Sequence, residues 1–407
     1  RIRLSKRKEQ PMKSIWALIV LAVIATGLMF LPYGEKSQSP GKSAVLSAAD
    51  ISRKGISLFK HGDFEKAIDC FSRVIARNPR DSQAYFDRAL AYYALDDYSS
   101  ALKDYSKDIS ITPGSVQGYF NRGVLYLRLN KNDSAAKDFG EVLRLNPADL
   151  EAYVNRGVAY YTLGKDAEAI TDFSECLSKD IHNSRALFNR GRVWAKLDSN
   201  DRAIADFNAA LSLGTSDFEV YMALGVVYTK TAQDHNALRS FNNALRIEPR
   251  NPSARTNSAN SYALLGQNDK ALAEYNLAVA YGSEDAEAFF NRGLFYVKQG
   301  KPDLALADFS KAVSLDEHHV KAHFNRGILY AKLHRQEDAI ADFSKAIEGN
   351  PGDPESYLDR GLAFVDLKQN RKAADDLNMF LKLHAVNDKK AENFREAIRN
   401  LGYKPEY

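Results

Sequence analysis

Small and apolar residues recur along this chain with one constant period from Ala48 onward, without insertion or deletion. Within each period the apolar positions follow helical spacing twice, and Gly, Asn or Asp separates the two stretches. One phase of the period holds glycine in eight units and alanine in the other two, at Gly55, Ala89, Gly123, Gly157, Gly191, Gly225, Ala259, Gly293, Gly327 and Gly361. A second phase holds alanine in all ten units, from Ala67 to Ala373. Each period therefore predicts a pair of closely packed helices.

Self-similarity at a fixed period of about 34 residues indicates stacked helical hairpins, none of which can bury its apolar face alone. Proline closes several units at the same phase, where one helix must stop before the next begins. These prolines are Pro79, Pro113, Pro147, Pro249 and Pro351. We predict an all-α solenoid of ten helix-turn-helix units over residues 48–387. Residues 388–407 carry apolar positions at helical spacing, which predicts a helix that caps the last unit.

The order of aromatic, Gly, Tyr, Ala, Phe and Pro within each period resembles the tetratricopeptide repeat. The resemblance covers residues 48–387, about five-sixths of the chain. It implies a right-handed superhelix in which the first helix of each unit lines a concave channel. It also implies a scaffold that binds a protein or an extended peptide, in secretion, envelope or outer-membrane assembly.

The asparagine series consists of six residues that share one phase of the first helix, mostly within the motif Asn-Arg-Gly. They are Asn121, Asn155, Asn189, Asn257, Asn291 and Asn325, with Asp87 and Asp359 at the equivalent places of two further units. In the family this phase faces the channel, and the series resembles ladders whose amides clamp the backbone of an extended peptide. An amide supplies a donor and an acceptor and can pair with a peptide unit without reading its side chain. The alternative is that each amide bonds its own helical wall or water.

A phenylalanine series precedes the asparagine series by one residue and predicts an apolar lining of the channel, although such a stripe also suits a core. It comprises Phe86, Phe120, Phe188, Phe290 and Phe324, continued by apolar residues at other units and by a second stripe four residues later that includes Leu90, Val124, Val226 and Leu362. We predict that these phenylalanines contact a peptide ligand. Paired lysines that would hold an acidic peptide tail are missing at this phase, and Lys321 matches only in part.

A series of arginines lies sixteen residues before a series of aspartates, as in Arg156 and Asp172. Where the arginine is lost the aspartate is lost too, because Leu224 accompanies Ser240 and Ser258 accompanies Glu274. This joint loss predicts an ion pair between the two helices of one unit, with a structural role. In the first unit Lys54 and Asp69 are expected to form the pair. Residues 218–285 diverge as a block, which indicates either a flexible joint or a separate contact patch.

Residues 1–32 predict a membrane segment. Six Lys and Arg residues lie between Arg1 and Lys13, and the uncharged run Ile15–Leu31 follows. The basic flank places the repeats on the non-cytoplasmic side, periplasmic or extracellular, with residues 33–47 as a flexible tether. A cleaved signal peptide with a site near Ala25-Thr26-Gly27, and hence soluble export, is the alternative. An import receptor that faces the cytosol would share the plan of anchor and repeats.

Charge and reactive residues exclude several functions. The net charge of +4 comes from the N-terminal segment, and the repeats are nearly neutral, so we expect no nucleic-acid ligand. The two cysteines, Cys70 and Cys176, are predicted to be buried and unpaired. The eight histidines form no recurring set, and His319 and His323 lack a third ligand. We predict no enzyme activity, cofactor, metal or small-molecule substrate. The alternative to a scaffold is a non-catalytic targeting or adaptor subunit of an enzyme, import or secretion complex.

Overall fold

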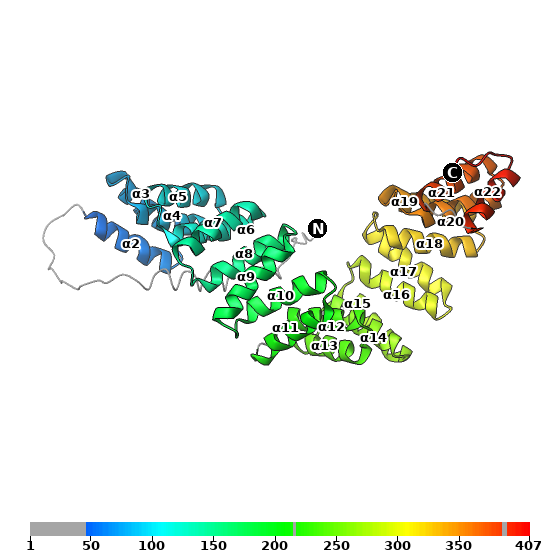
Figure 1. The fold of residues 1–407 in the computed structure, drawn as a ribbon, viewed down its shortest axis with the longest axis horizontal. Helices are drawn as coiled ribbons and strands as arrows, with labels where there is room; N and C mark the ends of the chain where they lie inside the picture. Colours follow the sequence, from blue (N-terminus) through cyan, green and yellow to red (C-terminus); the bar gives the residue numbers. More distant parts are fainter. Residues whose placement is uncertain (1–45, 215–216, 385–388) are drawn as a thin grey trace, which may run out of the picture. The chain divides into compact units, whose positions relative to one another are not determined.

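The computed structural model describes residues 46–214, 217–384 and 389–407, and these ranges contain helices and no strand. Helices of two kinds alternate along the chain (Figure 1). The first helices of the repeats are α2 (Ala48–Lys60), α4 (Ser82–Ala94), α6 (Val116–Arg128), α8 (Leu150–Thr162), α10 (Ser184–Lys196), α12 (Phe218–Lys230), α14 (Pro252–Leu264), α16 (Ala286–Lys298), α18 (Val320–Lys332) and α20 (Pro354–Asp366). The second helices are α3 (Phe64–Arg77), α5 (Tyr98–Ile111), α7 (Asn132–Leu145), α9 (Asp166–Lys179), α11 (Asn200–Ser212), α13 (Asp234–Ile247), α15 (Asn268–Tyr281), α17 (Pro302–Leu315), α19 (Gln336–Gly349) and α21 (Asn370–His384), and α22 (Lys389–Asn400) follows them.

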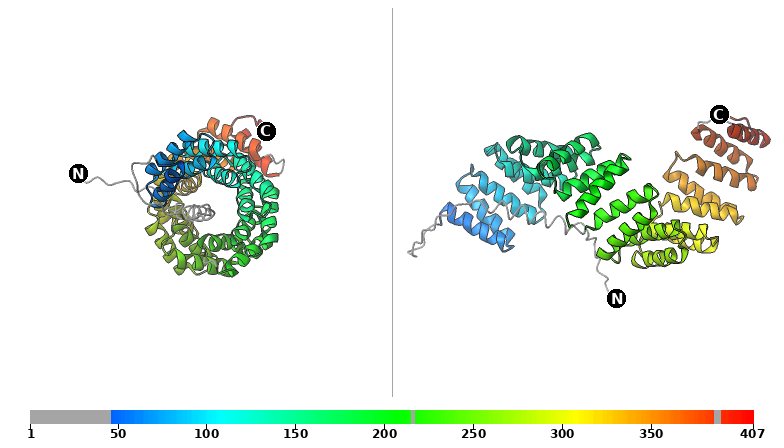
Figure 2. Two further views of the ribbon diagram at one scale, coloured as in Figure 1. Left: turned by 90° about the vertical axis from the view of Figure 1, so that its left-hand side faces the viewer. Right: turned by 60° about the horizontal axis from the view of Figure 1, so that its bottom comes forward.

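The repeats form two larger compact units, each of several helix pairs, and the boundary between Val193 and Trp194 falls within α10. Inside each unit the two helices of a repeat pack as a pair, and each pair packs on the next (Figures 1 and 2). First helices of successive repeats also contact one another, as α6 does with α8 and α14 with α16, whereas second helices approach one another less. Elements on the inside of a curved stack lie closer together. The surface formed by the first helices is therefore called the inner face of each unit.

Close packing between the two helices of a repeat depends on a glycine that faces a phenylalanine. A Cβ atom on Gly123, Gly157, Gly225, Gly293 or Gly327 would lie within 3.0 Å of the phenylalanine sixteen residues later. Those rings, from Phe139 to Phe343, are among the most deeply buried side chains in the described ranges. Where alanine occupies the glycine phase, at Ala89 and Ala259, the facing ring is Tyr105 or Tyr275. In these repeats the two positions therefore vary together, whereas in the last repeat Gly361 faces Leu377.

A methyl group added at Gly157 is expected to destabilise the fourth repeat. An ideal Cβ atom there would lie 2.6 Å from Cε1 of Phe173, whose ring is fully buried. Overpacking of this kind costs about 1–3 kcal/mol. We expect Gly157→Ala to lower the melting temperature measured by circular dichroism. The matched control is Gly140→Ala on α7, where the nearest atom would be 3.8 Å away. The control should melt at or slightly above the wild type, because alanine favours helix over glycine by about 1 kcal/mol.

Both ends of the first helices are fixed by local chemistry. Most begin after a side chain that accepts a hydrogen bond from the third residue beyond it, as Asp149 does from the Ala152 N–H at 2.9 Å. Each is followed by a residue with positive φ, which reverses the chain toward the second helix. Gly62, Gly164, Gly266 and Gly300 occupy this place in four repeats, and non-glycine residues such as Asp96 and Asn130 occupy it in the others. These constraints recur from repeat to repeat and keep the helix pairs in register.

The predicted membrane segment, residues 1–32, and most of the predicted tether lie outside the described residues. Among the helices that the structure does describe, none combines the length and the apolar character needed to cross a bilayer. At the other end, α22 packs its buried Ile398 and Ala391 against the last repeat. The ring of Phe394 meets Phe380 of α21 edge to face, with centroids 4.9 Å apart.

Candidate functional site

The asparagine series lies along the first helices, and four of its amides share one conformation. Nδ2 of each donates to the backbone carbonyl four residues earlier in the same helix. These bonds join Asn121 to Gln117 at 2.9 Å and Asn189 to Arg185, Asn291 to Glu287 and Asn325 to Lys321 at 2.8 Å each. All four residues are partly exposed. The bond uses one N–H of each amide. Asn121 and Asn325 keep the amide oxygen and the second N–H outside it, whereas Oδ1 of Asn189 also accepts from Arg192 Nη1 at 3.4 Å and Nδ2 of Asn291 also donates to Glu287 Oε2 at 3.4 Å.

Asn155 differs from the rest of the series because it is buried within the wall. Only 7% of it is exposed, and its Oδ1 accepts a hydrogen bond from Nη2 of Arg185 in the next repeat at 3.2 Å. Arg185 also pairs with Glu151. Asn257 is partly exposed, in the divergent block. We therefore remove Asn155 from the predicted binding surface, because its amide serves the contact between two repeats.

The phenylalanine series packs mainly inward. Phe86 and Phe290 are each 5% exposed, with ring centroids 5.8 Å from Tyr105 and 5.7 Å from Phe309. This burial corrects the prediction for these two residues, since a covered ring offers a ligand almost no surface. Phe120, Phe188 and Phe324 are partly exposed and keep an edge available. The sequence could not distinguish these cases, because a stripe at i and i+4 suits a core as well as a surface.

Apolar surface on the inner face comes instead from the second stripe, four residues after the phenylalanines. Val226 on α12 is 51% exposed and Leu362 on α20 is 46% exposed, whereas Val124 on α6 is 7% exposed. Val226 and Leu362 each lie three residues, about one helical turn, after the asparagine phase. Isolated exposed apolar residues are common on protein surfaces. The asparagine phase beside them holds Ala223 in the sixth repeat and Asp359 in the tenth, so the exposed apolar surface lies where asparagine is replaced.

The predicted ion pair between the two helices of a repeat is formed in six repeats. Nε and Nη2 of the arginine donate to the two carboxylate oxygens at 2.7–2.9 Å. The pairs are Arg88–Asp104, Arg122–Asp138, Arg156–Asp172, Arg292–Asp308, Arg326–Asp342 and Arg360–Asp376. The hydrogen bond to aspartate, opposed by burial, raises the pKa of each of these arginines. The aspartates are buried, and the geometry is bidentate.

The arginines also link neighbouring repeats, a contact that the sequence argument missed. Nη1 of Arg122 donates to Ser106 Oγ of the preceding second helix at 3.1 Å, and Arg88, Arg326 and Arg360 do the same with their serines. The guanidinium of Arg122 also lies over the rings of Tyr119 and Tyr126. A serine that recurs sixteen residues before the arginine was the available signal. These side chains hold neighbouring helices together and do not form a ligand site.

The first repeat corrects one predicted pair. Lys54 is exposed, and Asp69 lies 3.8 Å from Arg73 on its own helix, so the expected pair of Lys54 and Asp69 is not formed. The residue sixteen positions after Lys54 is Cys70, which is buried. In the divergent block, Glu274 is paired instead with Arg255 at 2.7 Å. The loss of the regular pair is therefore compensated in the seventh repeat by a different arginine.

Two aspartates replace asparagine in the series and have raised pKa values. Asp87 is buried, and burial raises its pKa to about 7, although the hydrogen bond from Gln83 Nε2 opposes the shift. Within the described ranges its Oδ2 has no hydrogen-bond partner. Burial also raises the pKa of Asp359 to about 6, with Glu355 and Asp353 adding to the shift. An aspartate has nearly the same shape as an asparagine, and burial at this phase favours its neutral form relative to an exposed aspartate.

His319 and His323 do not converge on one point. His323 is bonded through both ring nitrogens, with Nδ1 2.8 Å from Asp342 Oδ1 and Nε2 3.1 Å from the Glu317 carbonyl oxygen. His319 caps α18 through Nδ1, which accepts from the Ala322 N–H at 3.2 Å. No group of three metal-ligating side chains with suitable geometry occurs among the residues that the structure places. Within the same residues both cysteines are buried and free.

Comparison with protein families matches most of the repeat region. A model described as the tetratricopeptide repeat matches residues 52–115, 120–184 and 290–354, and two further repeat models of this kind match 218–251 and 259–300. No curated protein matches the chain. Helical hairpins of constant length, with polar and apolar groups along one face, define a helical-repeat scaffold. The chain belongs to the tetratricopeptide repeat family, whose members are generally non-catalytic interaction scaffolds.

Several solved structures are similar to this chain. YrrB, described as a TPR protein with an unusual peptide-binding site, is 24% identical and aligns with 46% of this chain and 96% of its own, at a TM-score of 0.40. Yeast Tom70 is 12% identical and aligns with 87% of this chain and 95% of its own, at a TM-score of 0.49. MamA from Desulfovibrio magneticus is 19% identical and aligns with 42% of this chain and 97% of its own, at 0.40. At these identities the likeness concerns the fold alone.

Proposed function

We propose that the inner face binds an extended segment of a partner protein. The observation that carries the proposal is the common conformation of Asn121, Asn189, Asn291 and Asn325, in which the same bond to the helix backbone holds each amide at the same place in its repeat. An extended peptide presents alternating N–H and C=O groups that such amides can pair with. Val226 and Leu362 supply apolar contact beside the series. The partner is a protein or peptide, and the chain acts without a cofactor or a catalytic step.

Loss of two amides in adjacent repeats is expected to weaken partner binding without unfolding the chain. Photo-crosslinking from position 226 identifies the partner segment, and fluorescence anisotropy then measures the affinity of that segment as a peptide. Each amide lost removes hydrogen bonds worth about 1 kcal/mol, so Asn291→Ala/Asn325→Ala should bind about tenfold or more weakly. The amides bond only their own exposed helix surface, and the melting temperature should change little.

The matched control is Asn208→Ala, an exposed asparagine on the second helix α11. It should bind the peptide as the wild type does. Equal affinity of the double variant and the wild type would contradict binding through the asparagine series. The surface formed by the second helices would then be the better candidate.

We also propose that residues 1–32 tether the repeats to a membrane, with the repeats on the non-cytoplasmic side. The support is the basic flank before the uncharged run Ile15–Leu31. Protease digestion of intact cells and of spheroplasts tests the topology, since repeats exposed to the cytosol would stay protected in both. Cleavage of the segment as a signal peptide would appear as a shorter mature chain by mass spectrometry. In the alternative role, as a targeting or adaptor subunit of an enzyme, import or secretion complex, the chain would bind its partner through the same inner face.

A further inference from the structure

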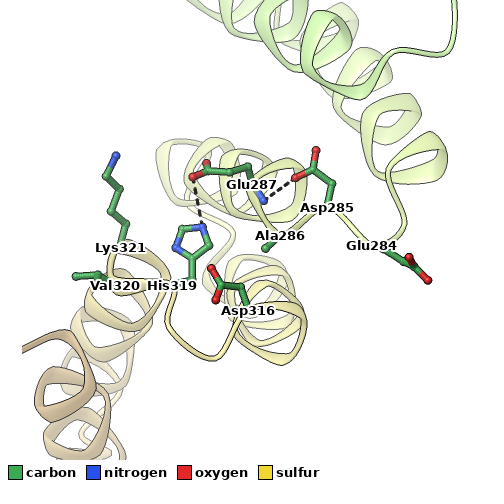
Figure 3. Close-up of a pocket in the computed structure, with 8 residues that line it drawn as sticks. All are labelled: Glu284, Asp285, Ala286, Glu287, Asp316, His319, Val320 and Lys321. Carbon is green, nitrogen blue, oxygen red and sulfur yellow. Dashed lines mark hydrogen bonds and ion pairs between the residues drawn. The ribbon is translucent and has the colours of Figure 1, made fainter. Parts of the chain in front are cut away.

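An acidic pocket lies between the start of α16 and the start of α18, within one of the two units. It has a volume of about 340 Å³ and is lined by Glu284, Asp285, Ala286, Glu287, Asp316, His319, Val320 and Lys321 (Figure 3). Four carboxylates and one ammonium group therefore border it. Lys321 extends along one rim, away from Asp316 (Figure 3). A concave surface with this excess of negative charge attracts a cation.

His319 gives the pocket a buried ring nitrogen that lacks a hydrogen-bond partner among the described residues. The residue is 7% exposed, and within the described ranges its Nε2 has no hydrogen-bond partner. Because Nδ1 accepts the Ala322 N–H, the proton of the neutral ring resides on Nε2. That N–H is directed toward Glu287, whose Oε1 is 3.6 Å away, beyond a normal hydrogen bond (Figure 3). A buried donor left unpaired is costly, so the ring is set to meet an acceptor from outside.

The ring of His319 is also held in place. It packs against Phe290 with centroids 4.9 Å apart, and its Nδ1 is fixed at the helix start. Every other first helix with a side-chain cap in the described ranges uses Ser, Asp or Asn at this phase. Histidine performs the same capping with one nitrogen and points a second polar atom into the pocket. The chain thus combines an N-cap with a preorganised donor at this one repeat.

The pocket adjoins the asparagine series. Glu287 lies one helical turn before Asn291, whose Nδ2 is 2.8 Å from the Glu287 carbonyl oxygen and 3.4 Å from its Oε2. Lys321 stands in the same relation to Asn325. A peptide paired with these two amides would therefore pass the mouth of the pocket. Glu287 and Lys321, which line the pocket, therefore connect it to the two amides that a peptide would pair with.

We infer that this pocket binds an arginine side chain of the bound peptide, with His319 Nε2–H donating to a peptide carbonyl beside it. The inference rests on the proposed function, which supplies the peptide. A planar guanidinium donates several hydrogen bonds at once to carboxylates such as Glu287 and Asp316, whereas an ammonium group acts as a point charge. The volume suits one long side chain with its adjoining peptide unit, at the lower end of the range for ligand pockets.

The test uses the full chain in detergent with ¹³C-labelled histidine and two small probes. Acetyl-arginine methylamide carries the guanidinium and two amide carbonyls, and acetyl-citrulline methylamide has the same shape without the charge. The His319 Cε1–H signal, assigned by its loss in His319→Asn, should shift with the arginine probe and not with the citrulline probe. Asparagine is chosen because Asn183 and Asn251 cap other helices of this chain. Glu287→Gln should raise the dissociation constant about tenfold.

Glu355→Gln is the matched control, since Glu355 is exposed at the same phase of α20, two residues after the aspartate cap Asp353 as Glu287 is after Asp285, and does not line the pocket. It should leave the response unchanged. Equal shifts with both probes, no shift up to the solubility limit of the arginine probe, or an unchanged affinity in Glu287→Gln would each overturn the inference. The two proposals fail separately. If Asn291→Ala/Asn325→Ala loses peptide binding but the His319 signal does not respond to the arginine probe, only the pocket proposal fails. If the double variant binds the peptide normally but the His319 signal responds to the arginine probe alone, only the proposal for the asparagine series fails.

Discussion

Replacing Arg156 by leucine is expected to destabilise the fourth repeat by about 3–5 kcal/mol, because it leaves a buried carboxylate without its partner. Arg156 donates to Asp172 at 2.7 and 2.8 Å, and the Asp172 side chain is 4% exposed. Burial already raises the pKa of Asp172, although Arg156 opposes it, and without the arginine that burial acts unopposed. Arg156 is suited to the test because Gly140 stands where other repeats supply a serine to the arginine.

The sixth repeat suggests the matching control. There Leu224 and Ser240 occupy the two phases, and Ser240 Oγ donates to its own helix at 2.9 Å. Arg156→Leu/Asp172→Ser reproduces this arrangement and should regain most of the lost stability. Melting followed by circular dichroism, with hydrogen exchange of α8 and α9, provides the measurement. Peptide affinity at a temperature where the variants stay folded should change little. A single variant that melts like the wild type but loses its ligand would place Arg156 in the binding site.

Asp87→Asn is expected to make the N-terminal repeats more stable at pH 8 than the wild type, and no more stable at pH 4. The pKa of Asp87 is about 7 in the folded chain against an ordinary value of 3.8. Between these values the folded state holds a proton that the unfolded state has lost, so stability falls as pH rises through this window and is constant above it. The full loss approaches about 4 kcal/mol, since one pKa unit corresponds to about 1.4 kcal/mol. Asparagine stays neutral at every pH and removes this slope.

The measurement is the melting temperature of wild type and variant at several pH values from 4 to 8, with hydrogen exchange of α4 to localise the change. A residual slope is expected from Asp108, because burial raises its pKa as well, while hydrogen bonds from Ser115 and Ser82 oppose the shift. Asp133→Asn on α7 removes only an exposed ion pair with Lys165 and should change the pH profile little. A variant that keeps the full wild-type slope would show that Asp87 stays ionised in the folded chain.

The periodic part of the structure could be predicted because the same residue types recur at the same positions in each repeat. First helices begin at one constant spacing along the whole repeat region, from Ala48 to Pro354. The arginine and aspartate pairs followed from their joint loss at Leu224 and Ser240, which is a contact signal within one chain. The glycine phase predicted close packing of paired helices, and the distance of 2.6 Å between an ideal Cβ on Gly157 and the ring of Phe173 agrees.

Features that interrupt the period could not be predicted. Asn155 shares its phase with the rest of the series, but Arg185 covers it from the next repeat, and nothing within its own helix indicates this. Phe86 and Phe290 are buried although Phe120 is partly exposed, since depth depends on the facing helix. His319 and His323 lie four residues apart, yet Asp342, nineteen residues after His323, decides where that ring points. Helical spacing gives the face of a helix and not the tertiary partner.

The constant spacing of helix starts has an evolutionary consequence. Insertion or removal of one whole period would rejoin the same type of cap, the same reversal and the same interhelix contacts. Such events, frequent in genes with tandem similarity, would yield a folded chain whose recognition surface is longer or shorter by one module. The number of modules can therefore change to suit the length of what is bound, without any redesign of the joints.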